Sequence, residues 1–293
     1  MNYIKLRDMS LSQIVLGTEG YGDGERIDKK TAFSLMEAYL ENGGNVIDSA
    51  RLYCGGKSEE VVGEFIKGKR DNVYISTKCA HPLTLSDLSH VRLDKKEIED
   101  DVEKSLLALK TDYIDILWLH RDDEEKAVGP IIDTLNYLVK CGKVRHFGAS
   151  NWSYERIMEA NEYAKKTNQT GFCASQGLYN LATRNGIWDF KLSYIEEEKE
   201  KYDKGLLPVF AFSSQAKGFF EKYAVGQLSD KARDRYLNDE SIKTFNIIKE
   251  RAEKENKSIS SVALKMLCER SNFDVFPIIG PSKLSQLKQT LDL

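Results

Sequence analysis

The feature that most constrains this chain is a regular alternation of short apolar runs with longer amphipathic segments. Such alternation is typical of βαβ units, in which helices join parallel strands. The runs are apolar throughout rather than alternating in polarity, as expected for strands that helices cover. The predicted strands are residues 14–17, 46–48, 73–77, 114–119, 145–149, 171–175, 207–212 and 275–279.

The segments between these runs predict helices with recognisable ends. Asp28 can cap a helix that carries Phe33, Met36 and Leu40 on one face and stops at Gly43. Similar spacing predicts helices over residues 95–110, 131–139, 157–166, 242–254 and 260–270. Residues 3–6 alternate in polarity and residues 8–10 can turn, which predicts a strand or hairpin at the N-terminus.

Roughly eight strands, each followed by a helix, in 293 residues indicate an α/β protein with a (β/α)8 TIM barrel. A doubly wound sheet would carry a GxGxxG loop between its first strand and a helix. Gly17, Gly20 and Gly22 superficially resemble that loop, but no helix begins directly after them. Without a linker, repeat or low-complexity segment, residues 1–293 are expected to form one domain, with the long polar connection 213–240 as a lid.

Composition excludes several classes of function. Lys and Arg number 43 against 46 Asp and Glu, so nothing favours nucleic acid or an anionic membrane as a partner. The five cysteines form no CxxC pair and the four histidines have no metal-ligand spacing, which predicts free thiols and no metal. Cys54 and Cys79 adjoin candidate site residues, but buried small side chains are the favoured interpretation. Without an apolar signal segment or a run approaching ~20 apolar residues, a cytoplasmic protein is expected.

Polar residues follow the predicted strands, at the end of the barrel where active sites of this fold lie. They are Asp48, Lys78, His120, Ser150, Asn151, Gln176, Ser213 and Ser214. Taken singly, Asp48 and Lys78 could form a buried salt bridge, and Tyr53 or His120 could be packed core residues. Their joint presence on one rim instead predicts a catalytic site.

The chemistry of these side chains suits carbonyl reduction. A tyrosine with its ordinary pKa of about 10 is a poor acid at neutral pH. A neighbouring Lys78, fixed by Asp48, is expected to lower the pKa of Tyr53 and make it a general acid. His120 can polarise a substrate carbonyl, and this combination suits hydride transfer from a bound cofactor.

Five segments of the chain resemble the aldo-keto reductase family. They are residues 48–53, 75–78, 117–121, 148–151 and 280–282, in the family's order and spacing. The resemblance implies a (β/α)8 barrel that reduces an aldehyde or ketone, a small-molecule carbonyl substrate, with NADPH. It also implies Asp48, Tyr53, Lys78 and His120 as the catalytic tetrad, with Tyr53 as the acid in reduction and, as phenolate, the base in oxidation.

The resemblance further implies a set of cofactor-binding residues. They are Gly17, Thr18, Asp48, Ser150, Asn151, Gln176, Phe212, Ser213, Ser214, Gln215, Lys217, Gly218, Gly280, Ser282, Lys283, Gln286 and Gln289. The family's Tyr-Ser-Pro-Leu is replaced here at 212–215, where Phe212 keeps an aromatic face. Ser282 and Thr290 stand where the family often has Arg and Asn, so Lys283 would supply the charge for NADPH, and NADH is an alternative.

The substrate and the direction of the reaction are less defined. The sequence ends at Leu293 without the long C-terminal loop of some members, which predicts an open pocket. Tyr21, Trp118, Trp152 and Trp188 are candidate walls, each also a plausible core residue, and aromatic walls suit a sugar or an aromatic carbonyl. The alternatives are a sugar or polyol dehydrogenase, a slow-turnover cofactor-sensing regulatory protein of the same fold, and a cofactor-independent lyase or isomerase.

Overall fold

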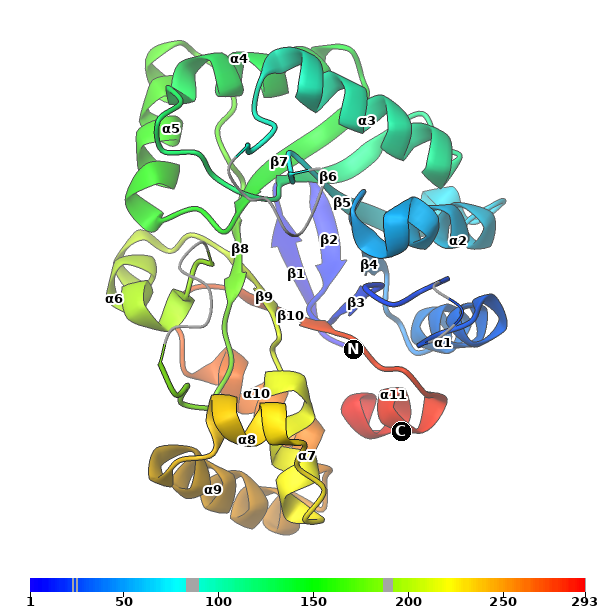
Figure 1. Cartoon of the computed structure of the whole chain (residues 1–293), viewed down its shortest axis with the longest axis vertical. Helices are drawn as coiled ribbons and strands as arrows, with labels where there is room; N and C mark the ends of the chain where they lie inside the picture. The colour runs from blue at the N-terminus through cyan, green and yellow to red at the C-terminus, as the bar shows by residue number, and fades with distance from the viewer. Residues whose placement is uncertain (23, 25, 83–89, 187–191, 293) are drawn as a thin grey trace.

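The eight parallel strands of this protein form a closed barrel with helices around it (Figure 1). The computed structural model describes all residues except 23, 25, 83–89, 187–191 and 293. Neighbouring strands follow the order β10, β3, β4, β5, β6, β7, β8 and β9, with β9 paired back to β10. The predicted (β/α)8 barrel is therefore confirmed. The strands are β3 (Val15–Gly17), β4 (Val46–Asp48), β5 (Tyr74–Cys79), β6 (Ile114–Leu119), β7 (Val144–Ser150), β8 (Ser175–Leu178), β9 (Val209–Phe212) and β10 (Val275–Ile279).

An antiparallel hairpin precedes the barrel, as expected. It consists of β1 (Tyr3–Leu6) and β2 (Met9–Ser12), and lies across the centre of the ring of strands in Figure 1. Leu6, Met9 and Leu11 are buried in one cluster with apolar side chains from β4, β6, β9 and β10. Their burial closes the barrel at the amino ends of its strands, so the opposite end is left for a site.

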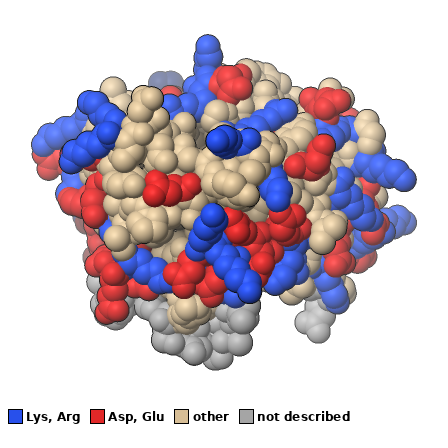
Figure 2. All heavy atoms as spheres, turned by 90° about the horizontal axis from the view of Figure 1, so that it is seen from above, with Lys and Arg blue, Asp and Glu red and all other residues tan. Residues whose placement is uncertain are grey.

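Helices cover the outer face of the barrel, and the main apolar core lies between them and the strands. They are α1 (Lys29–Glu41), α2 (Lys57–Phe65), α3 (Lys95–Leu109), α4 (Val128–Lys140), α5 (Tyr154–Lys166), α6 (Ile195–Gly205), α7 (Phe219–Ala224), α8 (Asp230–Tyr236), α9 (Asp239–Glu255), α10 (Ile259–Glu269) and α11 (Leu284–Leu291). The predicted cap of α1 is confirmed, because the Asp28 carboxylate accepts a hydrogen bond from Thr31 N at 2.7 Å. On the face shown in Figure 2, basic and acidic side chains are interspersed.

Two sequence predictions about the fold are wrong. The sixth barrel strand is Ser175–Leu178 rather than 171–175. Phe172 belongs to the outer core, and Asn161 Oδ1 accepts a hydrogen bond from its backbone N–H at 2.7 Å, so this apolar run only leads into the strand. The connection 213–240 contains α7 and α8, because Phe219, Phe220 and Tyr236 pack in an apolar cluster with α9 and α10. It is therefore a folded segment rather than a polar loop, and its role as a lid stays a prediction.

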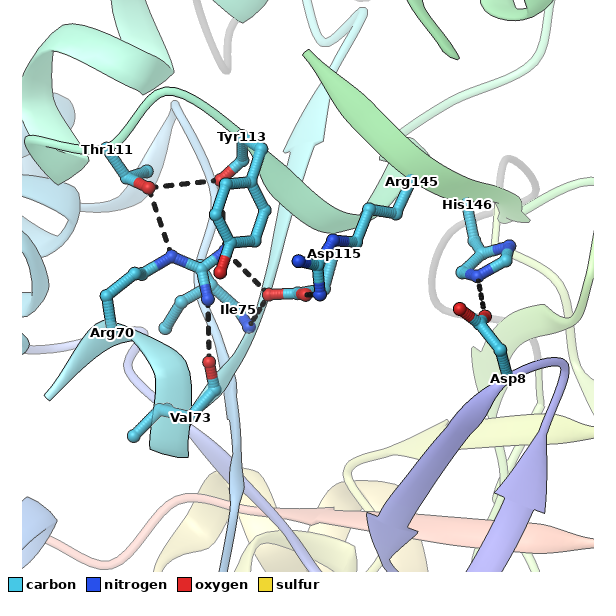
Figure 3. A network of polar contacts seen from close by, with 9 residues as sticks. All are labelled: Asp8, Arg70, Val73, Ile75, Thr111, Tyr113, Asp115, Arg145 and His146. Atoms are coloured by element: carbon cyan, nitrogen blue, oxygen red, sulfur yellow. Dashed lines mark hydrogen bonds and ion pairs between the residues drawn. The ribbon is translucent and has the colours of Figure 1, made fainter. Parts of the chain in front are cut away.

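A buried carboxylate ties together the amino ends of three strands (Figure 3). Asp115, on β6, accepts hydrogen bonds from Arg70 Nη2 at 2.7 Å, Ile75 N at 2.8 Å and Arg145 Nη1 at 3.0 Å. Both guanidinium carbons lie close to the centre of the Tyr113 ring, at 3.8 and 4.1 Å. The network fixes β5, β6 and β7 at the end of the barrel remote from the strand termini that carry the polar residues.

Among the described residues, none of the helices combines the length and the apolar character that crossing a bilayer requires. In the same part of the chain, no three His, Cys, Asp or Glu side chains are grouped so that they could hold a metal ion.

Substitution of Gly63 tests the close packing of α2 on α3. A Cβ at this position would lie 2.6 Å from the carbonyl carbon and 2.7 Å from the Cα of Leu109, both backbone atoms that cannot easily move. Alanine favours a helix by about 1 kcal/mol over glycine, but overpacking costs ~1–3 kcal/mol. Gly63→Ala is therefore expected to lower the free energy of unfolding by up to ~2 kcal/mol in chemical denaturation. Gly280→Ala is the control, since a Cβ there meets no atom within 4 Å.

Candidate active site

A cavity of about 930 Å³ opens at the carboxyl ends of the barrel strands. It is lined by segments from β3 at the start of the barrel to α11 at its end. All four residues of the predicted tetrad line it: Asp48, Tyr53, Lys78 and His120. The structure therefore brings together side chains from three successive strands and the turn after the first of them.

Asp48 and Lys78 form a buried ion pair on neighbouring strands. The Lys78 Nζ atom lies 2.5 Å from Asp48 Oδ2 and also donates to the carbonyl of Ser49 at 2.7 Å. The second carboxylate oxygen, Oδ1, accepts hydrogen bonds from Ser76 Oγ at 2.6 Å and Gln176 Nε2 at 3.3 Å. Both charged groups are almost fully buried, and their mutual pairing offsets the cost of that burial.

Tyr53 and His120 stand next to this pair. The Lys78 ammonium lies 4.8 Å from the centre of the Tyr53 ring, and the Tyr53 and His120 ring centres are 6.1 Å apart in an edge-on arrangement. His120 follows β6 directly, and its backbone N–H donates to the carbonyl of Cys79 at 2.8 Å. Tyr53 opens a short 3₁₀ turn (Tyr53–Gly56) before α2. The four side chains thus form one contiguous cluster.

Burial dominates the ionisation of this cluster. It raises the pKa of the Tyr53 phenol above its ordinary value, while the Lys78 ammonium opposes the rise and Asp48 adds to it. The expectation that Lys78 brings the pKa of Tyr53 below that of a free phenol is therefore wrong. The lysine acts in the expected direction, but loss of hydration has the larger effect.

The other two titratable groups are displaced in opposite directions. Burial, the largest single effect, lowers the pKa of Lys78, but the charges and hydrogen bonds of Asp48 and Tyr53 together outweigh it, so the pKa is raised. Burial, followed by Lys78 and His81, holds the pKa of His120 well below its usual value. At neutral pH the cluster therefore contains a protonated phenol, an ammonium and a neutral imidazole.

Three predicted polar residues form the wall beside the tetrad. Asn151, with a left-handed φ of 60°, donates from Nδ2 to the carbonyl of His120 at 3.1 Å and to Ser150 Oγ at 3.2 Å. Its backbone N–H donates to the carbonyl of Gln176 at 3.1 Å. Ser150, Asn151 and Gln176 all line the cavity. Hydroxyl and amide groups are thereby held in fixed positions next to Asp48.

The segment after β9, the strand next to β8, forms a further part of the wall. Ser213 and Lys217 have left-handed φ values of 51° and 57°, which non-glycine residues rarely adopt. Ser214 Oγ donates to the carbonyl of Ile278 at 2.7 Å, and Gln215 Nε2 to Thr290 Oγ1 at 3.2 Å. These bonds join the segment to β10 and α11. The predicted residues that line this region are Gly17, Thr18, Phe212, Ser213, Ser214, Gln215, Lys217, Gly218, Gly280, Ser282, Gln286 and Gln289.

Several predicted site residues lie elsewhere. Lys283 is exposed at the start of α11 and is not among the residues that line the cavity. Trp118 is fully buried inside the barrel against Phe210, with ring centres 4.9 Å apart. Trp152 packs outward on Phe172 and donates from Nε1 to the carbonyl of Arg121 at 3.2 Å. Trp188 falls outside the described residues.

The cavity also includes residues that the sequence analysis missed. Charged side chains among them are Glu19, Arg26, Arg121, Glu221, Lys222 and Arg235. Arg121 directly follows His120, so its place after a strand was a usable signal. Glu221, Lys222 and Arg235, from α7 and α8, carried no such signal in the sequence. They reach the cavity only because the segment after β9 folds back over the barrel.

Two buried polar atoms at this site find no hydrogen-bond partner in the part of the chain that the structure describes. The Tyr21 hydroxyl and the Nδ1 atom of His120 have no hydrogen-bond partner among the described residues, although both side chains line the cavity. Buried polar groups in folded proteins are normally paired. These two atoms are therefore candidates for contact with a bound molecule.

Comparison with known proteins gives concordant matches. Residues 13–293 match the model of the Aldo/keto reductase family. The norsolorinic acid reductase of Aspergillus flavus is 29% identical over 295 residues, covering 96% of this chain and 73% of the relative. A putative aryl-alcohol dehydrogenase of Saccharomyces cerevisiae is 26% identical over 318 residues, covering 98% and 80%. An aldo-keto reductase from Klebsiella pneumoniae, solved in complex with NADPH, has a TM-score of 0.75 and 24% identity, covers 100% of this chain and 90% of its own, and supports the fold.

Proposed function

This chain belongs to the aldo/keto reductase family, and we propose that it is an NADP(H)-dependent oxidoreductase. In this proposal it reduces an aldehyde or ketone to an alcohol by hydride transfer, with Tyr53 as the general acid. The observation that carries the proposal is the Lys78 ammonium, 2.5 Å from an Asp48 oxygen and 4.8 Å from the centre of the Tyr53 ring, at the wall of one cavity.

Tyr53 has the protonation state that reduction needs. Because burial raises the pKa of its phenol, the hydroxyl keeps its proton at neutral pH. Addition of hydride to a carbonyl leaves an alkoxide, which is a much stronger base than a phenolate, so proton transfer from Tyr53 remains favourable. Lys78 stabilises the phenolate that results, and Asp48 keeps that lysine charged and in place.

His120 is proposed to act on the substrate oxygen. Its lowered pKa keeps the imidazole neutral, so one ring nitrogen can donate a hydrogen bond without adding a charge to the site. Such a donor polarises a carbonyl and stabilises the developing alkoxide. The bond from Asn151 to the His120 carbonyl holds this residue in position.

The residues present fit a nicotinamide dinucleotide. The cavity volume of about 930 Å³ is at the upper end of the ~300–1,000 Å³ of ligand pockets. Ser150, Asn151 and Gln176 would hold the carboxamide, and Phe212 would cover one face of its ring. Residues 213–218 and 280–289 would hold the phosphates and the adenosine. When bound, this cofactor supplies the hydride.

We further infer that residues 1–293 act as one domain and that the substrate is an aromatic carbonyl compound. Residues from Gly17 to Thr290 line the same cavity, so no smaller part of the chain would complete it. Tyr21 contributes an aromatic wall, and the curated relatives are named for norsolorinic acid and aryl alcohols.

Cofactor binding and turnover test the proposal directly. NADPH is expected to quench the tryptophan fluorescence, since Trp118 lies inside the barrel below His120, and an aryl aldehyde is expected to oxidise the bound NADPH in stopped-flow measurements. Titration with NADH alongside gives the preference between the two cofactors.

Each rival function predicts a different result. Absence of quenching by both nucleotides would contradict the proposal and favour a cofactor-independent enzyme. Quenching without oxidation of bound NADPH by any of a panel of aldehydes and ketones would favour a cofactor-sensing regulatory protein. Faster oxidation of sugars or polyols than reduction of any carbonyl would favour a dehydrogenase.

A further inference from the structure

A second buried carboxylate lies close to the tetrad without being part of it. Glu59, on α2, has no exposed side-chain surface. Its Oε2 atom accepts a hydrogen bond from Arg51 Nη1 at 3.0 Å, and its Oε1 atom accepts one from Thr77 Oγ1 at 2.6 Å. A buried ion pair is seldom more stabilising than well-packed apolar side chains. The burial of Glu59 therefore calls for a reason other than stability, and its two partners supply one.

Both partners belong to segments that carry the proposed catalytic groups. Arg51 precedes Tyr53 by two residues in the turn after β4, and Thr77 precedes Lys78 on β5. The backbone N–H of Arg51 donates to the carbonyl of Lys78 at 3.2 Å, which joins the same two segments a second time. Glu59 thus bridges the turn that holds the phenol and the strand that holds the ammonium.

The turn after Tyr53 depends on outside support. Cys54, Gly55 and Gly56 are successive residues with left-handed φ values of 51°, 64° and 94°. Glycine adopts such values freely, but Cys54 carries a Cβ, and strained backbone persists only where its surroundings fix it. A Cβ on Gly56 would collide with the Arg51 guanidinium, so that group lies directly against the glycine backbone. Arg51 is therefore held between the turn and Glu59. Because Glu59 lies on α2, the position of this helix fixes the position of the turn through Arg51.

We propose that Glu59 is a positioning residue, which through Arg51 and Thr77 sets the distance between the Tyr53 phenol and the Lys78 ammonium. This inference rests on the proposed function, because it assigns Glu59 a role in the proton transfer from Tyr53. It extends that function by naming a residue that touches neither substrate nor cofactor. A misplacement of ~1 Å can cost on the order of 100-fold in rate.

Glu59→Gln keeps the shape of the side chain and removes the charge that holds Arg51. The expected result is a fall in kcat for aldehyde reduction of ~10-fold or more, with the NADPH dissociation constant unchanged. Alcohol oxidation should begin at higher pH than in the wild type, because a more distant Lys78 lowers the pKa of Tyr53 less. If Glu59 had a purely structural role, its substitution would not lower kcat while leaving NADPH binding unchanged, and it would not shift the pH profile.

Hydrogen exchange gives a readout that does not depend on turnover. Relative to exchange in the rest of the barrel, amide exchange over residues 51–56 is expected to become ~10-fold faster in Glu59→Gln. Loss of one partner of a buried ion pair also lowers the global stability, so the comparison within one protein is the readout. Arg51→Met, at a side chain that is 31% exposed, is the second variant, and the double variant should show no additional loss. Glu64→Gln, which removes an exposed carboxylate from the same helix, is the matched control and should behave as wild type.

The outcomes separate the two proposals. The positioning role would be overturned if folded Glu59→Gln had the kcat, the pH profile and the local exchange of the wild type. If Glu59→Gln does not fold, the same three measurements on Arg51→Met decide. An increase in exchange over residues 51–56 no greater than that in the rest of the barrel would also overturn it, since that result means only a general loss of stability. A wild-type protein without NADPH oxidation would contradict the proposed function, and the local exchange over residues 51–56 would still decide the role of Glu59.

Discussion

Tyr53→Phe is expected to lose nearly all carbonyl reductase activity, with kcat lower by ~10²–10⁴-fold, and to bind NADPH as the wild type does. The substitution removes only the hydroxyl, so the ring, its 4.8 Å contact with Lys78 and the edge-on packing on His120 remain. The proton that the alkoxide needs would then have to come from water. Stopped-flow oxidation of bound NADPH by an aryl aldehyde, together with fluorescence titration of the cofactor, measures the two quantities separately.

The pH dependence follows from the raised pKa of Tyr53. Reduction uses the protonated phenol, so its rate should be flat through neutral pH and fall only above the ordinary tyrosine value of about 10. Oxidation uses the phenolate and should rise over the same alkaline range. Tyr163→Phe is the control, because it removes a surface hydroxyl that donates to Asp133. Wild-type turnover in Tyr53→Phe would show that another group donates the proton.

The barrel and the clustering of Asp48, Lys78 and His120 were accessible from sequence because both are encoded locally. Apolar runs mark the strands, and a polar residue directly after such a run lies at the end of the barrel that carries active sites. Asp48, Lys78 and His120 satisfy this rule with no knowledge of packing. The prediction of strand 171–175 failed because burial alone does not separate a strand from an apolar approach to one.

The direction of the pKa change at Tyr53 needed three-dimensional information. Sequence order places a cation near the phenol, and the structure agrees that Lys78 lowers its pKa. The size of the opposing burial effect depends on how completely the surrounding segments exclude water, and these come from distant parts of the chain. An argument from the neighbouring residue alone therefore gave the correct direction for the effect of Lys78, but the wrong direction for the total change in the pKa of Tyr53.

The tryptophans show a similar limit. Trp118 and His120 are two residues apart and so face the same side of the sheet, but Trp118 lies within β6 and His120 just beyond its carboxyl end. A Cβ on Gly148 of the neighbouring strand would collide with the Trp118 ring, so this glycine makes room for the indole inside the barrel. Distinguishing a cavity wall from a core residue therefore depends on the identity of a residue on another strand.

Asp115→Asn is expected to lower the free energy of unfolding by about 3 kcal/mol, the largest stability effect predicted for this chain. Removing one member of a buried ion pair costs ~3–5 kcal/mol, and the lower figure applies because the Arg145 side chain is 49% exposed. The asparagine amide would face two guanidinium groups with no charge to balance them (Figure 3). Chemical denaturation of the two proteins measures the difference.

The two arginines give an internal ranking for the same network. Arg70 is 16% exposed and also donates to the carbonyls of Val73 at 2.7 Å and Tyr113 at 3.0 Å, so Arg70→Met should destabilise more than Arg145→Met. Glu103→Gln, in an exposed pair with Lys143, should leave the unfolding midpoint unchanged. The distance between this network and the proposed catalytic groups gives a second check. Asp115 lies near the amino end of β6 and His120 just beyond its carboxyl end, so folded Asp115→Asn should retain wild-type kcat. If Asp115→Asn lowers the free energy of unfolding by less than about 1 kcal/mol, or lowers kcat without lowering stability, a structural role for this carboxylate is contradicted.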